Sequence, residues 1–181
     1  LHPLDFVRCA DCGLILADPM PSLEVVAKGN EALSLLQGGR GMLNQYMGGK
    51  EFARHLASFR ERGALLDVGC AEGFFLFGVA ENSAWRAEGL EILRQDVDFA
   101  RRSLGIASHW GTLETLDPQE HRYDYIRLNN VLEHVEDPAG FLRHAFGLLL
   151  SGGRIYCSTP NGLQDGHVLR TANRRGIVLN L

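Results

Sequence analysis

The stretch Leu65-Leu-Asp-Val-Gly-Cys-Ala-Glu-Gly73 decides the fold of this chain. The apolar run Ala64–Val68 predicts a short buried strand, and Gly69 and Gly73 predict a turn directly after it. The residues Gly73–Glu81 are apolar nearly all round, which predicts a buried helix. A strand, a glycine-rich turn and a helix in this order indicate the beginning of a βαβ unit.

Further strands and helices alternate downstream of this unit. A helix is expected from Leu93 to Leu104, and another from the N-cap Asp137 to Leu150. Because right-handed crossovers join such strands, the pattern predicts a Rossmann-like, doubly wound α/β fold with a mostly parallel sheet and helices on both faces. Ligands of these sheets bind at the carboxyl ends of the strands, near the switch in strand order. The expected strands are Arg86–Glu91, Ile106–His109, Tyr123–Asn129 and Arg154–Thr159.

The residues upstream divide into two parts. Residues 1–22 form an N-terminal segment whose last residues, Asp18-Pro-Met-Pro-Ser22, exclude helix and supply a good N-cap. Residues 23–62 hold a helix at Leu23–Leu36, a loop or mobile hinge at Gln37–Gly49, which has five glycines, and a second amphipathic helix after it. The main α/β domain is then expected at residues 63–181.

Composition narrows the class of protein. The 181 residues are 45% hydrophobic and 22% charged, as in an ordinary globular domain, which excludes disorder and coiled coils. The net charge of −4 gives no basic excess to attract nucleic acid. The longest stretch without a charged residue is the eleven residues Ser103–Leu113, too short to span a membrane. We therefore expect a soluble, cytoplasmic protein.

Cys9 and Cys12 are the one pair of cysteines with metal-ligand spacing. Structural zinc takes four ligands, so this pair supplies half of a zinc site. The alternative is two unpaired thiols on a turn.

Candidate ligand-binding residues follow the first two strands. The turn Asp67–Gly73 differs from a dinucleotide fingerprint, which needs glycine where this chain has Phe74, and it lacks the Gly-Lys-Ser/Thr of a phosphate-binding loop. A tight strand–helix packing turn would have the same glycines.

Glu91 closes the second strand, where a carboxylate can accept hydrogen bonds from both ribose hydroxyls. The alternative for Glu91 is a solvated surface carboxylate.

Two more clusters follow the third and fourth strands. In Gly111-Thr-Leu-Glu114, Leu113 can cover an adenine and Glu114 can reach its amino group, although a plain helix start has the same sequence. The string Asn129-Asn-Val-Leu-Glu-His134 places polar groups at the end of a buried strand. His134 has the pKa range of a general base, and a capping histidine is the alternative.

These motifs resemble the class I S-adenosylmethionine (SAM)-dependent methyltransferases. The resemblance covers roughly residues 50–161. Within the class, the chain is most similar to the small-molecule methyltransferases, which include the ubiquinone-biosynthesis O-methyltransferases and sugar methyltransferases. The segment Val7–Gly13 through Pro21 resembles the second half of an N-terminal zinc ribbon found on some bacterial members. Besides the Leu65–Gly73 stretch, the matching strings are Gly89-Leu-Glu91, Asn130-Val-Leu-Glu-His-Val135, Ser151-Gly-Gly-Arg154 and Ser158-Thr-Pro-Asn161.

The resemblance implies a SAM-binding methyltransferase domain at 63–181 that transfers a methyl group to a small-molecule acceptor, on oxygen or carbon, by in-line displacement and releases S-adenosylhomocysteine (SAH). It implies Glu133 and His134 as the catalytic residues, with His109, His121 and His167 as weaker candidate bases. The implied cofactor-binding residues are Asp67, Gly69, Cys70, Ala71, Gly73, Glu91, Ile92, Leu113, Glu114, Asn129 and Asn130.

The chain also departs from the family pattern. Some relatives bind a divalent metal through Glu-x-x-Glu-His, but the first position here is the neutral Asn130, so no metal dependence is expected. Zinc would bind at Cys9 and Cys12 only if upstream cysteines complete the site. The family has two C-terminal hairpin strands, and Pro160–Leu181 has room for one helix around Gly166–Arg175 and a strand at Ile177–Leu181, so the hairpin is expected to be incomplete.

Two other classes remain open at this stage. One is a catalytically inactive domain of the same fold that acts as a binding or interaction module. The other is a nicotinamide dehydrogenase on the related Rossmann fold, which Phe74 argues against.

Overall fold

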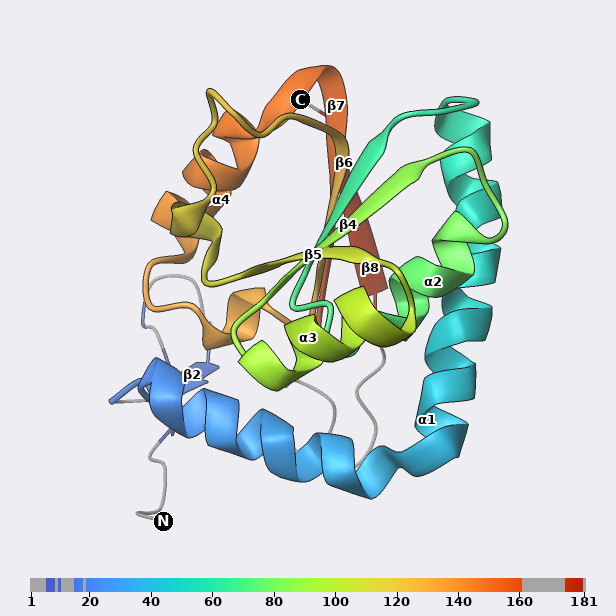
Figure 1. The fold of residues 1–181 in the computed structure, drawn as a ribbon. Helices are drawn as coiled ribbons and strands as arrows, with labels where there is room; N and C mark the ends of the chain where they lie inside the picture. The colour runs from blue at the N-terminus through green and yellow to red at the C-terminus, as the bar shows by residue number, and fades with distance from the viewer. Residues whose placement is uncertain (1–5, 9, 11–14, 18, 161–174, 181) are drawn as a thin grey trace.

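The computed structural model describes residues 6–8, 10, 15–17, 19–160 and 175–180 (Figure 1). Within these residues one sheet has the strand order β5-β4-β3-β6-β7-β8. The first five strands run parallel, and β8 (Arg175–Asn180) pairs antiparallel with β7. The parallel strands are β3 (Ala64–Val68), β4 (Arg86–Glu91), β5 (Ala107–Trp110), β6 (Tyr123–Asn129) and β7 (Leu149–Thr159).

The doubly wound α/β fold is thus confirmed. Strands β3, β4 and β6 have the predicted bounds, and β5 begins one residue later than expected. The expected strand at Ile177–Leu181 is β8, shifted towards the N-terminus, whereas His167 and most of the helix expected around Gly166–Arg175 lie outside the described residues.

Helices cover both faces of the sheet. On one face lie α1 (Leu23–Phe59), α2 (Phe74–Ala80) and α3 (Arg94–Ser103), and on the other lies α4 (Pro138–Gly147) (Figure 1). Two 3-10 turns, η1 (Leu113–Thr115) and η2 (Leu132–His134), follow β5 and β6. Every residue of β3 is buried, which explains why this strand has a continuous apolar run and not an alternating one.

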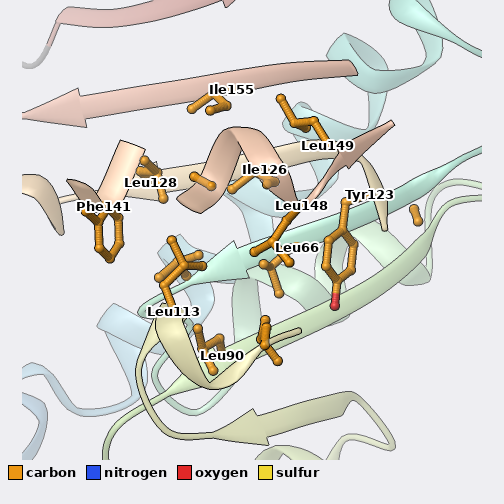
Figure 2. Close-up of a cluster of buried hydrophobic side chains, with 14 residues drawn as sticks. Leu66, Leu90, Leu113, Tyr123, Ile126, Leu128, Phe141, Leu148, Leu149 and Ile155 are labelled. Carbon is orange, nitrogen blue, oxygen red and sulfur yellow. The ribbon is translucent and has the colours of Figure 1, made fainter. Parts of the chain in front are cut away.

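Alternation along the strands sorts the core into two layers. Leu65 and Tyr125 pack with α1 and α2, while Leu66, Ile126 and Leu128 pack with α4 and η1. Figure 2 shows the second layer, in which Leu113 lies close to Leu90 and Leu66. In the part of the chain that is described, no helix is both long and apolar enough to cross a membrane.

The prediction of a loop at Gln37–Gly49 is wrong, because α1 runs without interruption through these residues. The last glycines of the stretch allow a close helix crossing. A Cβ on Gly49 would overlap the carbonyl oxygen of Phe75, and one on Gly78 of α2 would overlap the carbonyl oxygen of Tyr46. The sequence thus needs glycine here for packing and not for a turn. Figure 1 shows α1 changing direction between its blue first half and its cyan second half.

Helix α4 ends at Gly147, earlier than the predicted Leu150, and β7 begins at Leu149. The chain then bulges, because Tyr123 pairs with Leu149 while Tyr125 pairs with Arg154. Gly152 has φ +73° inside this bulge, a conformation that glycine adopts without strain. The predicted strand at Arg154–Thr159 is therefore the regular part of a longer one.

The N-terminal segment contains a small two-stranded sheet. Strand β1 (Phe6–Arg8) pairs antiparallel with β2 (Ile15–Ala17). Cys9 and Cys12, the predicted half zinc site, fall between these strands in sequence and lie outside the described residues. Among the described side chains, no cluster of three or more histidine, cysteine or acidic groups could hold a metal.

Candidate functional site

A cavity of about 610 Å³ opens at the carboxyl ends of β3 and β6. These two strands are neighbours, with β4 and β5 on one side and β7 on the other, so the cavity lies at the switch in strand order. Its lining residues come from α1, the β3 turn, the start of α2 and the end of β6. They are Arg40, Gly41, Asn44, Gln45, Gly48, Asp67, Gly69, Cys70, Ala71, Phe75, Arg127, Asn129 and Asn130.

The turn after β3 is left-handed at three alternate positions, Gly69 (φ +70°), Ala71 (φ +48°) and Gly73 (φ +83°). The glycines adopt this backbone freely, while a non-glycine residue such as Ala71 is strained there by about 1 kcal/mol or more. Backbone N–H groups of Gly69 and Cys70 donate to the Leu90 carbonyl at 2.8 and 3.2 Å, which ties the turn to β4. A Cβ on Gly69 would come within 3.0 Å of Val131, so the turn is tightly packed as well as strained.

Glu91 fixes the strained turn from the end of β4. Its carboxylate accepts from the backbone N–H of Ala71 at 3.0 Å, and from those of Ile92 and Leu93 at 2.8 and 3.0 Å. Glu91 is buried, so the predicted alternative of a solvated surface carboxylate is wrong. It lies behind the turn and does not itself line the cavity.

A partly buried ion pair lines the cavity. Arg127 in β6 donates to Asp67 in β3 at 2.7 Å, and Asp67 is 1% exposed. The guanidinium of Arg127 also lies 3.7 Å from the centroid of the Phe75 ring. Burial raises the pKa of the Asp67 carboxyl, and the charge and hydrogen bond of Arg127 act in the opposite direction.

The two asparagines lie together at the end of β6. Asn130 is left-handed (φ +57°), and its backbone N–H donates to the Ser158 carbonyl at 2.7 Å. Its side-chain Oδ1 is buried and has no hydrogen-bond partner among the described residues. A buried acceptor without a partner is costly, so this oxygen is a fitting contact for a ligand donor.

Cys70 contributes a neutral thiol to the lining. Burial raises its pKa well above the usual value, and the nearby carboxylates of Asp67 and Glu91 raise it further. Because the thiolate is the nucleophilic form of cysteine, this raised pKa disfavours a role for Cys70 as a nucleophile.

The sequence analysis missed the residues of α1 that line the cavity, and it missed Arg127. Arg40, Asn44 and Gln45 lie in the stretch interpreted as a loop, although the apolar spacing of Phe52, Leu56 and Phe59 continues backwards to Tyr46. Arg127 could have been noticed in the sequence, since it is a cation between the apolar residues Ile126 and Leu128 of a predicted strand.

Of the predicted cofactor-binding residues, Asp67, Gly69, Cys70, Ala71, Asn129 and Asn130 line the cavity. The other predicted residues are not among those that line it. Gly73 is the N-cap of α2, Ile92 is half-buried, Leu113 is 1% exposed in the core, and Glu114 is exposed on η1.

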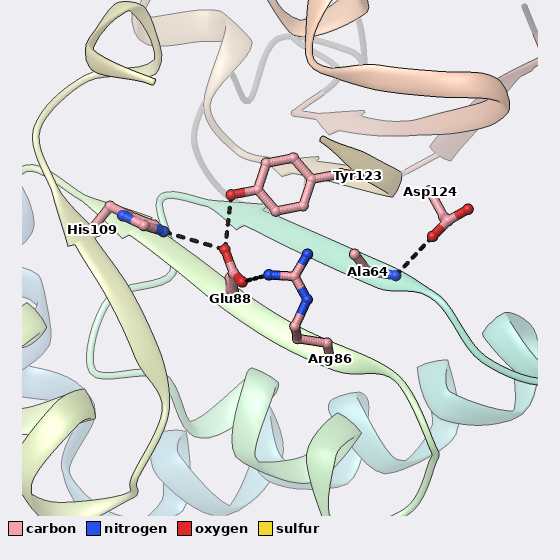
Figure 3. Close-up of polar contacts among 6 residues, drawn as sticks. All are labelled: Ala64, Arg86, Glu88, His109, Tyr123 and Asp124. Atoms are coloured by element: carbon pink, nitrogen blue, oxygen red, sulfur yellow. Dashed lines mark hydrogen bonds and ion pairs between the residues drawn. The ribbon is translucent and has the colours of Figure 1, made fainter. Parts of the chain in front are cut away.

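The predicted catalytic residues stand on η2, outside the cavity lining. Glu133 is half-buried and His134 is exposed. Of the weaker candidate bases, His109 lies with its Nε2 3.2 Å from a carboxylate oxygen of the buried Glu88 (Figure 3). The same carboxylate also accepts hydrogen bonds from Arg86 and from the Tyr123 hydroxyl. His121 stacks edge-on against His109 with ring centroids 5.0 Å apart, so both belong to a polar cluster of the sheet away from the cavity.

The comparison with family models decides the identity of this fold. The sequence model of the methyltransferase domain matches residues 43–176, which is most of the chain. The chain belongs to this methyltransferase-domain family. The matched residues run from the cavity-lining part of α1 into β8.

Curated relatives of this methyltransferase domain are ubiquinone biosynthesis O-methyltransferases. The protein from Coxiella burnetii is 29% identical over 102 residues, covering 54% of this chain and 43% of the relative. The protein from Parvibaculum lavamentivorans is 33% identical over 107 residues, covering 56% of this chain and 42% of the relative. The chain thus spans less than half the length of these relatives.

Solved methyltransferases share the fold. The plantazolicin methyltransferase BpumL, in complex with a monoazolic desmethylPZN analog and SAH, superposes with a TM-score of 0.63 at 15% identity, covering 78% of this chain and 58% of that protein. A putative SAM-dependent methyltransferase from Methanococcus maripaludis gives a TM-score of 0.58 at 18% identity, with 74% and 63% covered.

Proposed function

We propose that this domain binds SAM in the β3–β6 cavity and transfers its methyl group to a small-molecule acceptor, on oxygen or carbon. The observation that carries the proposal is the left-handed turn Gly69–Gly73 bordering a cavity at the switch in strand order of a methyltransferase-family domain. The SAH bound to BpumL and the O-methyltransferase activity named for the bacterial relatives support it.

The residues present fit the cofactor. A Cβ at Gly69 would crowd the turn, and Asn130 Oδ1 is a buried acceptor without a partner among the described residues. In our proposal Asp67 and Gly69 hold the methionine end, and Asn129 and Asn130 border the sulfonium. Glu91 accepts from a ribose hydroxyl, because its Oε2 accepts from the Ala71 N–H alone and has room for one more hydrogen bond. In our proposal Ile92 and Glu114 lie beside the adenine, and Leu113, which is buried in the core, supports η1 behind it.

When bound, SAM supplies a methyl group already activated by the positive sulfur. The protein's own task is therefore to align the acceptor with that methyl group and to exclude water. Phe75 and the turn close one side of the cavity, and α1 closes another. In our proposal His134, one turn after Asn130, accepts the acceptor's proton from the cavity mouth, with Glu133 beside it.

A calorimetric titration of the full chain with SAH, and in parallel with NAD, tests the cofactor assignment. We expect micromolar-range binding of SAH and no binding of NAD. The glycine that a dinucleotide fingerprint requires is Phe74 here, and Phe74 begins α2. Binding of NAD without SAH would overturn the assignment.

Glu91→Ala should weaken SAH binding by about 1–3 kcal/mol, since a charge-assisted hydrogen bond to the ribose is lost. The variant also releases the Ala71 N–H, so its thermal unfolding must be measured beside the calorimetry. Glu120→Ala, which removes an exposed carboxylate, is the matched control. An unchanged dissociation constant in a folded Glu91→Ala protein would remove Glu91 from the site.

The second candidate function is a domain that binds the cofactor without methyl transfer. It is favoured by one observation, the exposed position of His134 outside the cavity lining. An assay of SAH release from SAM with a range of hydroxyl and carbon acceptors separates the two. Tight SAH binding with no turnover of any acceptor would favour the binding module.

A further inference from the structure

The cavity has an excess of positive charge. Arg40 of α1 and Arg127 of β6 both line it, and Asp67 is the one carboxylate among the described lining residues. Asp67 is already paired with Arg127 at 2.7 Å, whereas Arg40 has no ion pair within the described part of the chain. The described lining thus has one positive charge without an ion-pair partner, while the Glu91 carboxylate behind the turn accepts three backbone N–H groups.

The cofactor adds to this charge, and here the inference rests on the proposed function. SAM has a cationic sulfonium and a cationic ammonium against one carboxylate, so it brings a net charge of about +1. Like charges in a partly enclosed, low-dielectric cavity repel one another more strongly than in water. A neutral acceptor would leave this repulsion in place, a cationic acceptor would increase it, and an anionic acceptor would offset it.

The donors in the cavity suit one kind of anion. Two guanidinium groups present planar forks of N–H donors, a geometry that matches a carboxylate in a bidentate arrangement. Arg127 is held in place by Asp67 and by the Phe75 ring, so its remaining donors are preorganised. The amides of Asn44, Gln45 and Asn129 add further neutral donors to the same lining.

We propose that the methyl acceptor of this domain carries a carboxylate, which Arg40 and Arg127 recognise inside the cavity. The guanidinium groups would also stabilise the negative charge of an ionised acceptor oxygen. His134, which lies outside the described lining, remains the group that takes the proton of that oxygen in the proposed function. Arg40 and Arg127 are then specificity-determining residues for the proposed reaction.

Matched acids and amides test this proposal on the full chain saturated with SAH. The pairs are benzoate and benzamide, acetate and acetamide, and glucuronate and glucuronamide, titrated at constant ionic strength with the unfolding temperature as the readout. We expect at least one acid to bind ten times more tightly than its amide. The preference should fall at least fivefold in Arg40→Gln and in Arg127→Lys. It should persist in Arg102→Gln, which removes the same charge from an exposed position on α3.

Three results would overturn the proposal. One is the absence of any acid preference in the unmodified chain. Another is an acid preference that survives in Arg40→Gln. Because Arg40 is exposed, this variant should fold even if Arg127→Lys does not. The third is that the arginine variants bind SAH more weakly but keep the preference for acids over amides. The arginines would then bind the carboxylate of the cofactor and not that of the acceptor. SAH binding to the unmodified chain is measured first, so failure of the proposed function is seen separately.

Discussion

Single glycines decide how closely α1 approaches the rest of the domain. Gly49 and Gly78 lie where the backbones of α1 and α2 nearly touch, and a methyl group at either position would overlap a carbonyl oxygen of the facing helix. Gly39 lies in the same helix, but a Cβ there would meet nothing within 4 Å. The same residue type therefore has opposite consequences ten residues apart, and local sequence does not distinguish them.

Gly49→Ala should destabilise the domain by about 3 kcal/mol or more, because the obstructing atom is backbone and cannot rotate away. Gly39→Ala should stabilise it by roughly 0.5–1 kcal/mol, since alanine is the better helix former at an exposed position. Urea unfolding followed by circular dichroism measures both. Equal effects of the two substitutions would contradict the close crossing of α1 and α2.

At the scale of elements, the sequence predicted what depends on local pattern. Strand β3 is a mostly apolar run directly before a glycine turn, and β3, β4 and β6 were all predicted with the bounds that the structure has. The turn from Gly69 to Gly73 was predicted too, because glycine at these two positions is a local requirement of backbone geometry. The cavity-lining part of α1 was missed because its glycines serve a contact with α2, which is distant in sequence.

Glu91 shows the same division within the candidate site. Its position at the end of β4 was predicted from the sequence. Its hydrogen bond to the backbone of Ala71 could not be predicted, because it depends on tertiary structure. Arg127 was visible as a cation in a buried strand, yet its pairing with Asp67 depends on the register between β3 and β6. Pattern indicates which residues are unusual, and packing decides what they contact.

Tyr125 links β6 to α1 and gives the sheet a pH dependence. Its hydroxyl lies 2.9 Å from Nε2 of His55, and its ring meets Phe52 edge-on at 5.6 Å between centroids. Burial raises its pKa to about 12, opposed by the charge of Arg154 and assisted by Tyr156. The folded state therefore favours the neutral phenol.

Stability should fall as the pH rises from about 10 to about 12, because the unfolded tyrosine ionises first and the unfolded state then binds fewer protons. The loss is up to about 2 kcal/mol for one group. Tyr125→Phe should be less stable by about 0.5–1.5 kcal/mol near pH 8, where the His55 contact is lost, and should show a shallower alkaline decline. Urea midpoints across this range measure it, and parallel declines in both proteins would contradict the role of Tyr125.

At the scale of the whole molecule, the cavity lies between parts of the chain that are far apart in sequence. Its lining comes from residues 40–48 of α1, residues 67–75 of the β3 turn and α2, and residues 127–130 of β6. Helix α4 covers the opposite face of the sheet and contributes no residue to this lining. A ligand in the cavity would therefore hold three separate segments together while leaving α4 untouched.

Hydrogen exchange with and without saturating SAH should show this directly. We expect slower amide exchange in peptides covering 40–48, 67–75 and 127–130, because a bound ligand stabilises the closed state by about 3 kcal/mol at 100 times its dissociation constant. A bound ligand slows exchange through global unfolding equally for all amides. The comparison therefore uses only amides that exchange by local opening, and α4 (Pro138–Gly147) is the internal reference. NAD at the same concentration is the control ligand. Protection confined to the β3 turn, with none in α1, would mean that the cavity-lining part of α1 takes no part in binding, and the charge argument built on Arg40 would fail with it.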